Sequence, residues 1–175
     1  TALWHISAAY LRLMAPILSF TAEEAFAMFS PNKDGTIFTE VYHAVPAVAD
    51  ADKLLAKWSL IRGVRADVLK RIEELRMQSL VGSSLQTECT ISASGEAFAA
   101  LESLGDELKF VMMTSKAALE KAEGETAVSV KVTEEKKCCR CWHYDASVGS
   151  NAEHPELCGR CLTNLFGAGE TRSKA

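Results

Sequence analysis

Four cysteines near the C-terminal end constrain this chain more than any other feature of its sequence. They form two C-x2-C pairs, Cys138 with Cys141 and Cys158 with Cys161, and sixteen residues separate the pairs. Each pair places two thiolates on one side of a tight turn, and two such pairs can enclose one metal ion tetrahedrally. The spacing is typical of structural zinc, with one ion per chain and no open position for water. Iron is the alternative, because four cysteines also hold iron-sulfur centres.

Three neighbouring side chains compete as ligands. Cys139 adjoins Cys138 and would break the two-residue spacing if it bound, so we treat it as a bystander. His143 and His154 are each able to replace a cysteine, but four correctly spaced thiols favour the all-cysteine site. The predicted ligands are therefore the two C-x2-C pairs.

The metal-binding tail is also the basic end of the chain. Residues 136–175 carry 6 Lys and Arg against 4 Asp and Glu, whereas residues 1–135 carry 13 against 19. Cations beside exposed aromatic rings are suited to hold phosphates and to stack on unpaired bases. The alternative is that Trp142 and Tyr144 are simply the small core of a zinc module.

The N-terminal part is predicted to be helical. Residues 3–14 are apolar at helical spacing, and the helix ends before the following proline. Thr21 and Glu24 have the spacing of a capping box, which predicts the start of a second, short helix. A long helix follows over residues 52–80, where apolar positions advance by threes and fours. Residues 1–80 are therefore expected to form one helical unit.

The period then changes from helical to alternating. Residues 85–92 place apolar side chains on one side and polar side chains on the other, which indicates a half-buried strand. Cys89 belongs to the inward set and is interpreted as a buried thiol rather than a nucleophile. The other elements expected in this small α/β module are a helix over 96–104, a strand over 109–115 and a third strand over 128–132.

The predicted fold class is α+β, with three domains. These are a helical unit (1–80), a small α/β module with about three strands (81–135) and a zinc-ribbon-like tail (136–175). No stretch resembles a signal peptide or reaches the eighteen or so apolar residues of a membrane span. Clustered C-x2-C pairs fit a reducing compartment, so we expect a cytoplasmic protein without a membrane partner.

Sequence motifs of catalysis are scarce. His154-Pro155-Glu156 followed by Cys158 superficially resembles zinc deaminases, but Leu157 stands where their motif has proline. The sequence has no glycine-rich phosphate loop, no G-x-S-x-G and no H-E-x-x-H. We therefore predict no catalytic and no organic cofactor-binding residues.

Several motifs together resemble the C-terminal part of bacterial isoleucyl-tRNA synthetase, a class I aminoacyl-tRNA synthetase. They cover nearly the whole chain: LRLMAPILSFTAEE at 11–24, LVGSSL at 80–85, LGDEL at 104–108, KC at 137–138, RCWHY at 140–144, EH at 153–154 and CGRC at 158–161. The first motif is shared with the synthetases for valine and leucine, and the tail points to isoleucine. Cys139 stands where that family often has another residue.

The resemblance implies that residues 1–80 belong to an anticodon-binding bundle and that the zinc tail reaches the anticodon stem-loop of the tRNA for isoleucine. The implied whole enzyme is a monomer that attaches isoleucine to tRNA with ATP and edits mischarged valine elsewhere. This chain lacks the HIGH and KMSKS signatures, so it is expected to be inactive alone and to act with upstream domains. The tRNA-contacting residues that we predict on this basis are Lys137, Arg140, Trp142, His143 and Arg160.

Two other classes of protein remain as alternatives. A free-standing zinc-ribbon module that binds RNA or protein would explain the tail but not the helical unit. A metalloenzyme would need an open coordination position, which four cysteines do not leave. An upstream reading frame that encodes HIGH and KMSKS would favour the synthetase, whereas translation that starts near Thr1 would favour the free-standing module.

Overall fold

The computed structural model describes residues 2–30 and 34–170. By their internal contacts the residues form two units, Thr1–Asp50 and Ala51–Ala175. None of the helices in the described ranges combines the length and the apolar character that crossing a membrane requires.

In its described residues, the first unit contains the helices α1 (Ala2–Met14) and α2 (Ser19–Phe29) and the short 3-10 turn η1 (Ile37–Thr39). Its buried residues are Ala15, Ala22, Phe26 and Ile37, with Leu11 and Met14 packed against them. The predicted capping box is wrong. Helix α2 already begins at Ser19, and its N-terminus has no side-chain cap. The carboxylate of Glu23 instead accepts a hydrogen bond from the backbone N–H of Ile37 at 2.9 Å and joins η1 to α2.

The long helix α3 (Ala51–Met77) packs on the sheet that follows it. Its buried residues are Ile61, Val64, Val68 and Ile72, which share one core with β1 and α4. The spacing of three and four places these side chains on one helix face. Contact therefore groups α3 with the α/β module, although the sequence predicts one helical unit over residues 1–80.

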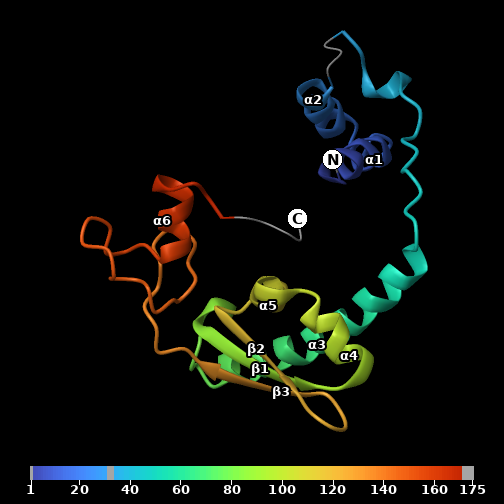
Figure 1. Cartoon of the computed structure of the whole chain (residues 1–175). Coiled ribbons are helices and arrows are strands. Elements are labelled where there is room, and N and C mark those ends of the chain that lie inside the picture. The colour runs from blue at the N-terminus through green and yellow to red at the C-terminus, as the bar shows by residue number, and fades with distance from the viewer. Residues whose placement is uncertain (1, 31–33, 171–175) are drawn as a thin grey trace. The chain divides into compact units, whose positions relative to one another are not determined.

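The second unit contains a three-stranded sheet in the order β2-β1-β3. Strand β1 (Thr87–Ala93) pairs in parallel with β2 (Lys116–Lys121) and antiparallel with β3 (Ala127–Val132). Figure 1 shows the three strands beside α3, α4 and α5. On β1, alternate residues from Thr87 to Ala93 are buried, as the predicted alternation requires.

The parallel pair needs a crossover connection, and helices supply it. After β1 the chain forms α4 (Gly95–Glu102), η3 (Gly105–Glu107) and α5 (Leu108–Met112) before it enters β2. The strand predicted over 109–115 is therefore wrong. Leu108 and Met112 stand four residues apart and are both buried in the core, which favours a helical turn. Met113 then ends α5 in the left-handed conformation, with φ of 60°.

The tail follows β3, and the part of it that the structure describes, residues 136–170, contains little regular structure. Its elements are an isolated antiparallel bridge between Lys137 and Tyr144 and the helix α6 (Gly159–Phe166). Its small core consists of three buried cysteines with Val148 and Leu157. The whole is an α+β fold with a four-cysteine tail, as the sequence predicts.

Candidate metal centre

A short hairpin presents the first cysteine pair. The N–H of Cys138 donates to the carbonyl of His143 at 2.8 Å, and the N–H of Trp142 donates to the carbonyl of Cys138 at 3.0 Å. Trp142 closes the turn in the left-handed conformation, with φ of 66°. These bonds fold the chain back on itself, so that Cys138 and Cys141 face the same side of the turn.

Helix α6 presents the second pair. Cys158 directly precedes the helix and is its N-terminal capping position, and Cys161 lies in the first helical turn. The Ser147 hydroxyl accepts a hydrogen bond from the N–H of Gly159 at 2.8 Å, which fixes the start of the helix against the preceding loop. The sulfurs of this pair are thereby held by a rigid element.

The four sulfur atoms converge on one point. The Sγ atoms of Cys138, Cys141, Cys158 and Cys161 all lie within 4.8 Å of one another, and those of Cys141 and Cys158 are 3.6 Å apart. A tetrahedral ion with metal–sulfur bonds of about 2.3 Å separates its sulfurs by about 3.8 Å. The cluster therefore has the dimensions of a four-thiolate zinc site.

Backbone hydrogen bonds lower the pKa of one of these four thiols, that of Cys138. Burial raises the pKa of the Cys138 thiol, but backbone N–H groups of Cys141, Cys158 and Arg140 outweigh it and bring the pKa to about 6. The N–H of Cys158 lies 3.4 Å from the Cys138 sulfur. Because a metal binds the thiolate, donors aimed at sulfur favour the binding form. Burial raises the pKa of Cys141 and Cys158, and a bound cation would offset this.

The competing side chains lie outside this cluster. Cys139 is exposed, and its N–H donates to the carbonyl of Glu156 at 3.0 Å. The ring of His154 stacks on Phe166 with centroids 4.2 Å apart. Cys89 is buried in the core of the α/β module, where burial raises the pKa of its thiol and keeps it unreactive.

Three of the five predicted RNA-contacting residues lie exposed on the hairpin. These are Lys137, Arg140 and Trp142. The Trp142 side chain is 61% exposed, and the Lys137 Nζ lies 5.4 Å from the centroid of its ring. Trp142 is therefore not a buried core residue of the zinc module. The alternative that it forms this core is wrong.

The other two predicted residues, His143 and Arg160, are half-buried and face the α/β module. Both contact the ring of Phe110 in α5. Arg160 also forms an ion pair with Glu170. Sequence reasoning missed Phe110 and Glu170, since neither belongs to a motif and Phe110 fell within the stretch misassigned as a strand.

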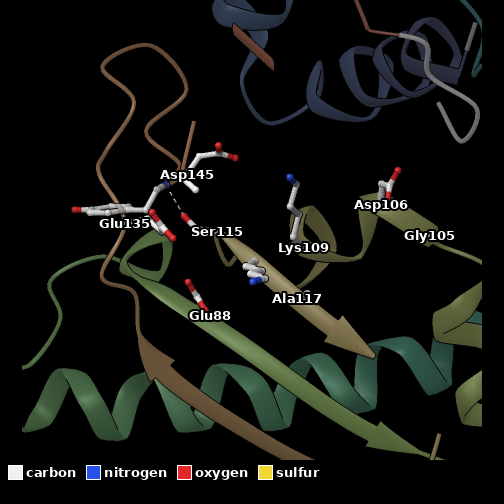
Figure 2. Close-up of a pocket in the computed structure, with 11 residues that line it drawn as sticks. Glu88, Gly105, Asp106, Lys109, Ser115, Ala117, Glu135 and Asp145 are labelled. Atoms are coloured by element: carbon white, nitrogen blue, oxygen red, sulfur yellow. Dashed lines mark hydrogen bonds between the residues drawn. The ribbon is translucent and has the colours of Figure 1, made fainter. Parts of the chain in front are cut away.

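A hydroxyl group joins the tail to the sheet. The Oγ of Ser115 accepts a hydrogen bond from the N–H of Tyr144 at 2.7 Å and donates to the carbonyl of Leu85 at 2.6 Å. Figure 2 shows Ser115 beside Asp145, at the edge of a cavity of about 510 Å³. The cavity is lined by residues of both the module and the tail, among them Lys109 and Ala146.

Comparison with known proteins supports the metal assignment. Residues 135–164 match the model of a zinc finger family described as "Zinc finger found in FPG and IleRS". This stretch contains the whole four-cysteine cluster. The tail is therefore a zinc finger with one structural zinc ion.

Similarity to known proteins extends over the whole chain. An isoleucine–tRNA ligase of Paraburkholderia xenovorans is 60% identical over 177 aligned residues, which include 100% of this chain and 19% of the relative. The corresponding ligase of Paraburkholderia phytofirmans is 59% identical with the same coverage. That of a Janthinobacterium species is 56% identical over 98% of this chain and 18% of the relative. Over its full length, this chain therefore matches the C-terminal part of isoleucine–tRNA ligases, the family that its motifs predict.

Proposed function

We propose that this chain is the tRNA-binding C-terminal region of an isoleucine–tRNA ligase, in which the zinc tail contacts the anticodon stem-loop. The whole enzyme would attach isoleucine to its tRNA with ATP in the cytoplasm, as a monomer. Because the chain spans about a fifth of the length of the ligases that it matches, activation of isoleucine belongs to upstream domains. The ligands of the structural zinc are Cys138, Cys141, Cys158 and Cys161.

One observation carries the proposal: Trp142 is an exposed aromatic side chain on a turn that two metal ligands hold. A base can stack on such a ring without first ordering the loop that bears it, which reduces the entropic cost of binding. Anticodon bases are single-stranded and can be splayed out to reach a ring. Lys137 and Arg140 on the same hairpin supply positive charge for the neighbouring phosphates.

In a full-length ligase that contains this chain, Trp142→Ala is expected to weaken tRNA binding by about 1 to 3 kcal/mol, the usual contribution of one base stack. This corresponds to a dissociation constant about 5 to 150 times larger. Filter binding or fluorescence anisotropy with the tRNA for isoleucine measures the change, and metal analysis of the same protein checks its zinc. Trp142→Phe is the matched control, because it keeps a ring at this position. Unchanged affinity, or loss of zinc, would reject the stacking role.

The purified 175-residue chain is expected to form no isoleucyl-tRNA when it is supplied with isoleucine, ATP and tRNA. The reason is that its sequence holds neither the HIGH nor the KMSKS signature of the nucleotide-binding fold. Its affinity for tRNA should be weak and should fall with salt, since each neutralised phosphate adds about one unit or less to the slope of log affinity against log salt. A full-length ligase assayed in parallel is the positive control. Aminoacylation by the purified chain would contradict the expectation.

A further inference from the structure

The junction between the zinc tail and the α/β module is organised around one aromatic ring. Phe110 of α5 is half-buried, and two residues of the tail contact it. The ring of His143 meets it edge-on, with centroids 5.3 Å apart and an interplanar angle of 79°. The guanidinium carbon of Arg160 lies 4.9 Å from its centroid. Both contacts have the geometry of favourable aromatic and cation–π interactions.

A carboxylate fixes the guanidinium group that covers Phe110. The Nε and a terminal nitrogen of Arg160 donate to the two carboxylate oxygens of Glu170 at 2.5 and 2.8 Å. Such a bidentate ion pair fixes the plane of the guanidinium group. The cation is therefore held in place toward the module and is already paired, which makes it a poor phosphate ligand.

The second contact at this junction is a single buried hydroxyl. Ser115 is 6% exposed, and its Oγ links the N–H of Tyr144 in the tail to the carbonyl of Leu85 in the module. Its own N–H donates to the carbonyl of Thr87 at 2.9 Å, which ties it to the central strand. Movement of the tail would break this hydrogen bond between the tail and the module.

Beside Ser115 the junction is open rather than packed. The cavity of about 510 Å³ lies between Glu88 and Lys109 of the module and Asp145 of the tail (Figure 2). Apolar burial therefore contributes little to this side of the junction. The orientation of the tail depends on a small number of contacts, so that single substitutions should change it.

We propose that Phe110 and Ser115 are positioning residues, which fix the zinc tail against the α/β module and thereby direct the Trp142 face toward RNA. His143 and Arg160 serve this junction instead of contacting tRNA. The orientation of the tail follows from the contacts alone, whereas its consequence for RNA rests on the function proposed above. Phe110 and Ser115 touch no ligand themselves and act through Trp142.

The orientation is tested on the zinc-loaded chain by ¹⁵N relaxation of backbone amides. The amides of β1 and of α6 should report one common rotational correlation time in the unsubstituted chain. In Phe110→Ala the α6 amides should acquire a shorter correlation time, while zinc content and hydrogen-exchange protection of β1 stay unchanged. Arg160→Ala removes the tail residue of the same contact and should also give the α6 amides a shorter correlation time. Phe110→Tyr keeps the ring and should behave as the unsubstituted chain.

Phe98→Ala is the matched control. Phe98 is also a half-buried phenylalanine of the α/β module, and the Lys121 Nζ lies 6.0 Å from its ring centroid. Its ring packs on the module core. Loss of this ring should leave the correlation time of α6 unchanged. Two correlation times in the unsubstituted chain, or one common time in both Phe110→Ala and Arg160→Ala, would overturn the proposal.

Salt dependence of tRNA binding separates positioning from contact in the full-length ligase. Arg140→Ala should reduce the slope of log affinity against log salt by about one unit, because a phosphate contact is lost. Phe110→Ala and Arg160→Ala should weaken binding by about 2- to 30-fold, the factor for one cation–π contact, with the slope unchanged. A reduced slope in Arg160→Ala would indicate that Arg160 contacts an RNA phosphate, and it would overturn the positioning role of this residue. If Trp142→Ala binds normally, the proposed function fails, while the relaxation result still decides the orientation.

Discussion

The Cys158→Ser, Cys161→Ser double variant is expected to lose its zinc and with it the fold of residues 136–170. A structural zinc site of this type contributes about 10 to 16 kcal/mol of apparent binding free energy at neutral pH. Whole domains are stable by about 5 to 15 kcal/mol. The buried residues around the metal are few, namely Val148 and Leu157 beside the cysteines, and cannot replace that contribution. Metal analysis measures the zinc, and amide chemical shifts report the fold of the tail.

Cys139→Ser is the matched control for this variant, because it removes an exposed thiol from the same turn. It should retain one zinc per chain and the shifts of the tail. In the double variant, the amides of β1 should keep their native shifts, since none of the described tail residues, 136–170, belongs to the core of the sheet. Full zinc occupancy in the double variant would refute the ligand assignment, as would zinc loss in Cys139→Ser.

Ile72→Ala in α3 is expected to destabilise the sheet unit by about 2 to 5 kcal/mol, the usual cost of truncating a buried isoleucine. Ile72 is 2% exposed and lies in the same cluster as Ile91 of β1 and Leu101 of α4. Hydrogen exchange of the Ile91 amide in the zinc-loaded chain reports the free energy of opening for this unit. The protection of Ile91 should therefore decrease by this amount.

Leu55→Ala is the control on the same helix, because the Leu55 side chain is 67% exposed. Its effect on the exchange of Ile91 should stay within about 0.5 kcal/mol. The comparison also tests where α3 belongs. If α3 packed only with the N-terminal helices, Ile72→Ala would leave the protection of Ile91 unchanged, and the grouping of α3 with the sheet would be wrong.

The metal cluster could be predicted from the sequence because its geometry is local. Within each C-x2-C pair the turn fixes the two sulfurs, and only the meeting of the pairs requires the tertiary fold. Strand β1 could be predicted for the same reason, since the alternation of apolar and polar residues around Cys89 and Ile91 is typical of a strand with one buried face. Both predictions rest on patterns that a few neighbouring residues carry.

The remaining differences have tertiary causes. Strand β2 is formed by Lys116–Lys121, a stretch rich in alanine, lysine and glutamate whose propensity favours a helix. Parallel pairing with β1 outweighs this preference, as tertiary context often does. The ion pair of Arg160 could not be predicted from the sequence, because its partner Glu170 lies ten residues away and outside the helix that bears Arg160.

The left-handed backbone at Trp142 has a consequence for how this protein can evolve. A bulky side chain with φ of 66° costs about 1 to 2 kcal/mol that glycine at the same position would not incur. Selection for thermal stability alone would therefore favour Trp142→Gly, which relaxes the turn and leaves all four cysteines in place. The same replacement would remove the exposed ring. Stability of the turn and the proposed stacking role therefore oppose each other at this single residue, because Trp142→Gly would keep the zinc site and remove the ring.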